Sequence, residues 1–426
     1  MNGIEDHPLR FSLANELHAR PFPTLEAPSR AAYLAIKQPE NAVGRDRDVD
    51  RGHLIALLDR YGAAHPQPGS THYSGDLGKY RLKWESHTEF VTYTVFRDGA
   101  AEEPFDGKTF EVFPNDWLAA APGQVITSAL VRVERETDPE AISKKMNDWF
   151  VPESLAVSTV LDDSAVMACD FRIDPAGHVR FALFVNASTD ERRIGRVVQR
   201  LCEIETYKSM SMLGLSRTRA IGGRMGEIDG QLSGLMQKMS EADSVAEETL
   251  ESLLNVSTEL ENMLAQTAFR FGATGAYEAL VNQRIEVLRE ERFFGRQTFG
   301  EFMARRFDPA MRTVKSVEGR LRTMAERAAR AADLLRTRVD VERSAQNQEL
   351  LASMDRRADM QLKLQRTVEG FSVVAISYYA VNLLTYLTYP LFAQAGVSKI
   401  AAMSLLTPLV LILIWFVVRR IRKTIE

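Results

Sequence analysis

The sequence contains few cysteines and has little net charge. The two cysteines among its 426 residues, Cys169 and Cys202, form no Cys-x-x-Cys pair, so neither a disulfide framework nor a structural zinc site is predicted. A net charge of -4 argues against a nucleic-acid partner held by phosphate charges. Glycine-rich phosphate loops, dinucleotide fingerprints, zinc-protease motifs and nucleophile elbows are also missing. We therefore predict no catalytic residue and no cofactor, and an enzyme is disfavoured.

Proline is scarce in the second half of the chain. Thirteen of the 16 prolines lie within the first 178 residues, and none occurs between Pro175 and Pro309. Proline removes a backbone hydrogen-bond donor and clashes with the preceding helical turn, so its scarcity indicates long helices. We place a boundary near Asp190.

Residues 1–190 are predicted to form a cytosolic mixed domain of the α+β or α/β class. Alternating or β-branched runs indicate seven strands, enough for one sheet, and two amphipathic segments indicate helices that cover a face. The order of the strands does not follow from the sequence. The strands are expected at residues 31–37, 80–84, 90–96, 124–133, 155–161, 166–173 and 179–185, and the helices at 49–61 and 139–149.

Residues 191–369 are predicted to form a stalk region of long helices, partly coiled coil. Residues 309–389 contain no internal proline, so one helix can continue into the apolar region. A seam with strict three-four spacing runs along it, which suits either an intramolecular helix hairpin or a self-associating stalk. The seam residues are Val314, Val317, Leu321, Met324, Ala328, Ala331 and Leu335.

Glycine recurs at every fourth position upstream of this helix, at Gly222, Gly226, Gly230 and Gly234. Each glycine costs a helix about 1 kcal/mol relative to alanine, so a packing reason is expected if the segment is helical. A close helix crossing is one such reason, and a flexible linker is the alternative.

The C-terminal region predicts a transmembrane hairpin. Residues 370–392 and 401–418 are each long enough to span a bilayer, and they are joined by a turn that contains Lys399. The basic tail at 419–426 favours both termini in the cytoplasm, and the N-terminus lacks a signal-peptide pattern. We expect a multi-pass protein of the bacterial inner membrane, with the lipid bilayer as a partner. A buried soluble hairpin is the alternative. The basic residues are Arg419, Arg420, Arg422 and Lys423.

Three groups of polar residues are candidate sites. Two clusters combine an imidazole with carboxylates, and they would form a ligand site if the fold brings them together; a capped turn and a hairpin are the alternatives. An acidic helical stretch offers hard oxygen ligands to a divalent cation, or it pairs with basic residues of the stalk. The clusters are Glu16, His18 and Arg20, then Glu85, His87 and Glu89; the weak metal candidates are Glu247, Glu248 and Glu251.

A polar stripe follows one side of the first predicted span. It consists of Tyr378, Asn382, Thr385 and Tyr389, whose spacing of four, three and four residues matches one helix face. An amide near the middle of a membrane normally finds a partner helix or water. The stripe therefore lines a pore in an oligomer or packs within the hairpin.

Four strings carry a family resemblance. They resemble a bacterial family described as uncharacterised membrane-anchored proteins, a domain of unknown function that spans nearly the whole chain and implies no activity. In plan the chain also resembles CorA-type magnesium channels, which are homopentamers with a pore lined by the first span. Their Gly-Met-Asn signature is missing; Ala380-Val381-Asn382 is the nearest string. The four strings are NELHARPFP, KWESHTEF, QRLCEIETYKSMSMLGL and LQRTVEGFSVVAISYYAVNL.

Two functions are compatible with these patterns. The first is a CorA-like ion transport protein, a homo-oligomer that self-associates through its stalk and conducts cations past Asn382. The second is a non-transporting membrane-anchored module that binds a ligand or partner through the region of His18 and Arg20. The architecture favours the first.

Overall fold

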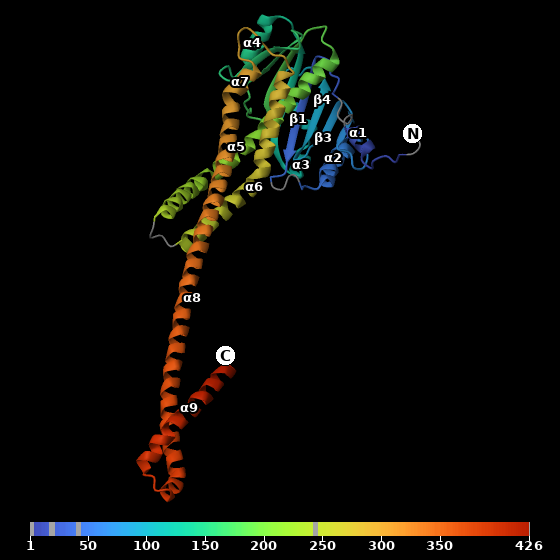
Figure 1. Ribbon diagram of the computed structural model, residues 1–426. Helices are drawn as coiled ribbons and strands as arrows, with labels where there is room; N and C mark the ends of the chain where they lie inside the picture. The colour runs from blue at the N-terminus through green and yellow to red at the C-terminus, as the bar shows by residue number, and fades with distance from the viewer. Residues whose placement is uncertain (1–3, 17–21, 40–43, 242–245, 426) are drawn as a thin grey trace. The chain divides into compact units, whose positions relative to one another are not determined.

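The computed structural model describes residues 4–16, 22–39, 44–241 and 246–425 (Figure 1). The chain divides into two compact units, which we treat separately. Unit 1 comprises residues 1–242 and 251–331, and unit 2 comprises residues 243–250 and 332–426.

Unit 1 is built on one mixed sheet. Nine strands of the described chain follow the order β2-β3-β4-β1-β5-β8-β7-β6-β9. Strands β5 and β8 run parallel, whereas the other neighbouring pairs are antiparallel. The seven predicted strands are confirmed, and two more, β2 and β9, join at the edges. The strands are β1 (Ser29–Lys37), β2 (His72–Leu77), β3 (Tyr80–Ser86), β4 (Phe90–Asp98), β5 (Gln124–Arg135), β6 (Ala156–Val160), β7 (Ala165–Cys169), β8 (Val179–Val185) and β9 (Glu291–Arg292).

The helices differ in length: the short ones lie mostly before residue 150, and the long ones all begin after residue 190. The predicted helices at 49–61 and 139–149 are confirmed as α2 and α4, and the long helix α5 begins at Glu191. The short helices are α1 (Arg10–Glu16), α2 (Arg47–Tyr61), the 3-10 helix η1 (Gly107–Val112), α3 (Asn115–Ala119), α4 (Pro139–Trp149) and α7 (Phe299–Arg306). The long ones are α5 (Glu191–Ser240), α6 (Ala246–Glu286), α8 (Asp308–Gln394) and α9 (Lys399–Ile425).

The sheet is covered on both faces. Side chains of a strand alternate between faces, so Tyr33 of β1 belongs to a core with α5, while its neighbour Leu34 belongs to a second core with α2 and α3. The first core also includes Phe299 of α7 and Met311 at the start of α8. The long helices therefore share their hydrophobic core with the sheet domain.

The predicted seam of α8 is covered within the chain. Val314, Leu321, Met324 and Ala328 are all buried. Polar pairs flank this stretch of α8: Lys315 binds Glu278 of α6 at 2.8 Å, and Arg320 binds Asp229 of α5 at 2.6 Å. The intramolecular alternative accounts for this part of the seam, and a self-associating coiled coil stays a prediction.

Unit 2 contains the apolar C-terminal region. Two helices of the described chain, the segment that ends at Gln394 and the segment from Lys399 to Arg420, are long and apolar enough to cross a membrane. Ser377, Val381 and Thr385 form the buried face of α8 here, each one helical turn from the next. Most of the large apolar side chains of this region are instead exposed, which argues against the soluble buried hairpin.

The glycine stripe of α5 is helical but makes no close crossing. A methyl group built at Gly226 or Gly230 meets no heavy atom within 4 Å, so the expected helix crossing is wrong at these positions. The close approach lies elsewhere on α5. A methyl group at Gly214 would overlap the side chain of Thr274 on α6.

Alanine substitutions at two glycines of α5 should have opposite effects. We expect Gly226→Ala to stabilise the protein by roughly 0.5–1 kcal/mol, because alanine loses less backbone entropy in a helix. We expect Gly214→Ala to destabilise it by about 1–3 kcal/mol, because α5 and α6 must separate to admit the methyl group. Thermal unfolding of the full-length protein in detergent measures both effects. If both changes lowered the midpoint equally, this would contradict the finding that Gly214 contacts α6 and Gly226 contacts no neighbouring helix.

Candidate functional site

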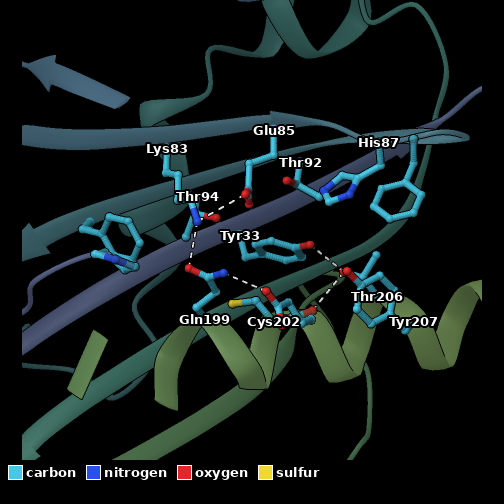
Figure 2. A pocket seen from close by; sticks show the side chains of 14 residues that line it. Tyr33, Lys83, Glu85, His87, Thr92, Thr94, Gln199, Cys202, Thr206 and Tyr207 are labelled. Atoms are coloured by element: carbon cyan, nitrogen blue, oxygen red, sulfur yellow. Dashed lines mark hydrogen bonds and ion pairs between the residues drawn. The ribbon is translucent and has the colours of Figure 1, made fainter. Parts of the chain in front are cut away.

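A cavity lies between the sheet and the first turns of α5 in unit 1. Its volume is about 380 Å³, part of which is open to solvent. Figure 2 shows strand residues on one side and helix residues on the other, with their side chains directed toward each other. The lining residues are Pro23, Tyr33, Lys83, Glu85, His87, Phe90, Thr92, Thr94, Phe96, Gln199, Cys202, Glu203, Thr206 and Tyr207.

Opposite charges stand side by side in this cavity. Lys83 and Glu85 are two positions apart on β3 and therefore share one face of the sheet. Their side chains are only 8% and 11% exposed, and Lys83 Nζ lies 3.3 Å from Glu85 Oε1. Lys83 also donates to Gln199 Oε1 of α5 at 2.7 Å (Figure 2). This bond joins the floor of the cavity to its roof.

The roof carries a second carboxylate. Gln199 Nε2 donates to Glu203 Oε1 at 2.7 Å, and Arg284 of α6 forms an ion pair with the same glutamate. A chain of polar contacts therefore runs from Lys83 through Gln199 and Glu203 to Arg284. Each of these contacts involves a charged or amide group, so together they hold the side chains in fixed positions.

The hydroxyls and the thiol of the cavity are not poised as nucleophiles. Tyr33 Oη and Thr206 Oγ1 lie 2.6 Å apart, and Thr206 donates onward to the Cys202 carbonyl at 2.9 Å. Burial raises the pKa of the Cys202 thiol and of the Tyr33 hydroxyl. A thiol with a raised pKa stays protonated at neutral pH, whereas nucleophilic attack requires the thiolate.

Aromatic rings form one end of the cavity. His87 stacks on Phe90 with the ring centres 4.4 Å apart, and Tyr207 stacks on Tyr277 of α6 at 5.7 Å. Because Tyr277 is buried beside Glu89, the pKa of its hydroxyl is raised, and this hydroxyl donates to Glu89 Oε1 at 3.1 Å. This end of the cavity is therefore lined by aromatic rings, and the hydroxyl of Tyr277 and the carboxylate of Glu89 lie behind them.

The predicted ligand residues separate into three groups. Glu85 and His87 line the cavity. Glu89 is buried and directed elsewhere, because it pairs with Arg270 of α6. His18 and Arg20 lie outside the described residues, as does the side chain of Glu16 at the end of α1.

Several lining residues were missed by sequence reasoning. Lys83 could have been found, since a residue two positions from Glu85 on a strand shares its face. Gln199, Glu203 and Thr206 recur at helical spacing on α5, but nothing in the sequence says which strands they meet. Tyr33 is separated from its partner Thr206 by 173 positions.

The other candidate residues lie in different surroundings. Glu247, Glu248 and Glu251 are exposed, and Glu247 accepts a hydrogen bond from Arg343 at 3.0 Å. In the part of the chain that the structure describes, no group of three or more His, Cys, Asp or Glu side chains is arranged to hold a metal ion.

The four residues of the predicted stripe on α8 differ in their exposure within this chain. Thr385 is buried and donates to the Val381 carbonyl at 2.7 Å, Asn382 is half-buried, and Tyr378 is 64% exposed. Tyr389 lies at the border between half-buried and exposed. The buried face, Ser377 to Thr385, is thus offset from the predicted stripe.

A buried arginine holds the turn between β3 and β4 that carries His87. Arg45 Nη2 donates to the carbonyls of His87 at 2.7 Å and Phe90 at 3.2 Å. Its Nε donates to Asp50 of α2 at 2.7 Å, and the two side chains are 1% and 3% exposed. Arg45 therefore positions two residues of the cavity without lining it.

Removal of Arg45 should be costly. Arg45→Met leaves the Asp50 carboxylate buried without its partner, so we expect a loss of about 3–5 kcal/mol in stability. Arg60→Met is the matched control, because the Arg60–Asp116 pair is exposed to solvent, which screens its attraction, and contributes little to stability. Thermal unfolding of both full-length variants measures the difference. Equal losses of stability in the two variants would contradict the role of Arg45 in holding the turn between β3 and β4.

Comparison with known proteins places the chain in a family. A family model described as "Protein of unknown function (DUF3422)" matches residues 5–425. No curated protein and no solved structure matches the chain. The resemblance in plan to CorA-type channels thus stays a prediction, whereas the resemblance to a family of unknown function is confirmed. Because the match covers nearly the whole chain, the protein belongs to the DUF3422 family.

Proposed function

We propose that the protein is a membrane-anchored module that binds a small polar ligand in the cavity between the sheet and α5. The observation that carries this proposal is the pair of nearly buried opposite charges, Lys83 and Glu85, at the wall of a partly open cavity. Burying two charges is expensive even when they are paired, and such groups are retained more readily where they serve a site.

The lining suggests the class of ligand. An ammonium group suits the carboxylates of Glu85 and Glu203, and a carboxylate group suits the Lys83 ammonium. The rings of Phe90 and Tyr207 provide an apolar surface beside these charges. A small zwitterion such as an amino acid satisfies all three features, so we propose that class.

The anchor is the helical hairpin of unit 2. The apolar parts of α8 and α9 would cross the bilayer, with the turn between them outside and both termini in the cytoplasm. The basic residues Arg419 and Arg420 beside the second span support this orientation under the positive-inside rule. A bacterial inner membrane is the location that we propose.

Amino acids should stabilise the full-length protein in detergent. We expect at least one of the 20 standard L-amino acids to raise the midpoint of thermal unfolding, since a ligand that binds only the folded state stabilises it. The double variant Lys83→Glu/Glu85→Lys retains an ion pair but reverses its direction. It should bind the same amino acid at least about tenfold more weakly.

Glu153→Gln is the control for this experiment, because Glu153 is exposed and does not line the cavity. It should respond to the amino acid like the unaltered protein. The proposal fails if none of the 20 amino acids shifts the midpoint, or if the reversed pair binds as tightly as the original.

A homo-oligomeric cation pathway is the second candidate. It is favoured by the length of α8, a single helix from Asp308 to Gln394 whose Met311 belongs to the hydrophobic core of unit 1. Tyr378 is exposed in this chain and is therefore available to another copy. In that arrangement the pore-lining residues would be Tyr378, Asn382, Thr385 and Tyr389.

The mass of the detergent-solubilised protein separates the two functions. A single pair of spans cannot enclose an ion path, so the pathway requires an oligomer, and a pentamer is expected from the CorA-like plan. Light scattering with correction for bound detergent gives this mass. A monomer would exclude the pathway. For an oligomer, Asn382→Leu should abolish cation flux into liposomes, while Leu387→Ala, on the opposite side of the helix, should not.

A further inference from the structure

Three arginines form a row across neighbouring strands on the other face of the sheet. Arg30 of β1 lies directly opposite Arg97 of β4 and directly opposite Arg132 of β5. Residues in register on adjacent strands place their side chains on the same face, about 5 Å apart at Cβ. Three positive charges are thus adjacent, although like charges in this arrangement destabilise a sheet.

The central arginine of the row lacks a partner. The side chain of Arg30 makes no hydrogen bond or ion pair with the residues that the structure describes, and its Nε is fully buried. Burial, followed by the charge of Arg97, lowers the pKa of the Arg30 guanidinium. A buried donor without an acceptor costs about 1–3 kcal/mol, so the protein gains stability if an acceptor arrives.

The two flanking arginines are held by other groups. Arg132 Nη1 donates to the Ala101 carbonyl at 2.9 Å, and Arg132 also pairs with Glu134. The Arg97 guanidinium lies 5.5 Å from the centre of the Tyr80 ring. These contacts position the two charges on either side of Arg30 without supplying it with an acceptor.

A cavity opens beside the row. The empty space in and in front of it is about 220 Å³, open solvent included, and Arg30, Arg132, Thr109 and Asp106 are among its lining residues. Asp106 is the acidic member of this wall, but its Oδ1 accepts a hydrogen bond from the backbone of Lys108 at 2.9 Å and forms no ion pair with the arginines. The charge of Asp106 acts on Arg30 only through space, so the Arg30 guanidinium is the charged group of this wall that lacks a bonded partner among the described residues.

We propose that this cavity binds a phosphate oxyanion, with Arg30 as its principal ligand and Arg132 as a second lining charge, while Arg97 adds positive charge beside Arg30 from outside the lining. A guanidinium presents several donors in a fixed fork that matches the oxygens of phosphate. The bound anion supplies the acceptor that Arg30 Nε lacks and offsets the repulsion along the row. The site lies on the face of the sheet opposite the Lys83 cavity, so it is separate from the function proposed above.

Phosphate titration of the full-length protein in detergent tests this site. We expect inorganic phosphate to raise the midpoint of thermal unfolding, while chloride at the same ionic strength does not. Arg30→Gln should weaken phosphate binding at least about tenfold. Without phosphate the same variant should melt no lower than the unaltered protein, because it removes a like-charge contact and a buried unpaired donor.

Arg81→Gln is the matched control. Arg81 also lies on the sheet, on β3, but it is bonded to the Thr24 carbonyl at 2.9 Å and stands outside the row. It should bind phosphate like the unaltered protein. If Arg30→Gln fails to fold, Arg132→Gln takes its place in the titration, and it should also weaken phosphate binding because Arg132 lines the cavity.

A second titration, with glycerol 3-phosphate, tells whether the site prefers free phosphate or a phosphate ester. Glycerol 3-phosphate carries the same oxyanion as an ester. Tighter binding of either compound supports the site and tells whether the group is free or esterified. The proposal is overturned if neither compound shifts the midpoint more than chloride does, or if the Arg81 variant loses as much affinity as the row variants.

Discussion

The packing of α5 against one face of the sheet is the contact on which the rest of unit 1 depends. Val197, Val198 and Leu201 of this helix are buried in one core with Tyr33 and Phe181 of the sheet. Burial of a large aliphatic side chain contributes about 1.5–3 kcal/mol, so three such residues already hold the helix firmly. The cavity exists because this apolar contact gives way to polar groups where Gln199 meets Lys83 (Figure 2).

The alternation of side chains along the strands allows one sheet to hold two different sites. On β1, Tyr33 lies on the face of the sheet that carries the Lys83 cavity, while Arg30 lies on the opposite face as part of the arginine row. Each site contains charged side chains that have few oppositely charged neighbours within the chain. The first site is internally balanced, since Lys83 and Glu85 pair with each other. In the second site the Arg30 guanidinium has no bonded partner among the described residues, and this is the physical reason to expect an anion there.

Much of the fold follows from local pattern, and the sites do not. Alternating apolar residues identify strands such as 90–96, but β2 is polar and β9 has two residues, so neither gives a recognisable signal. The heptad seam of α8 predicts a buried face without naming its partner. The cavity depends on strand order and register. These bring Lys83 to Gln199, 116 positions later, and no local pattern encodes such a contact.

The glycines of α5 show a further limit. Gly214 and Gly226 look alike in sequence, yet only Gly214 meets a neighbouring helix. The arginine row presents the same difficulty, because Arg30, Arg97 and Arg132 are unremarkable until the register of three strands places them side by side. Sequence reasoning therefore identifies elements, and tertiary register decides which of their residues can act together.

Hydrogen exchange of the full-length protein in detergent tests the packing of α5 on the sheet most directly. If this contact holds as described, the backbone amides of residues 191–211 exchange as slowly as those of β1 and β5, because they become exposed only when the whole unit opens. Amides of residues 191–211 that exchange much faster than those of the two strands would contradict the account, since the cavity would then lack its roof.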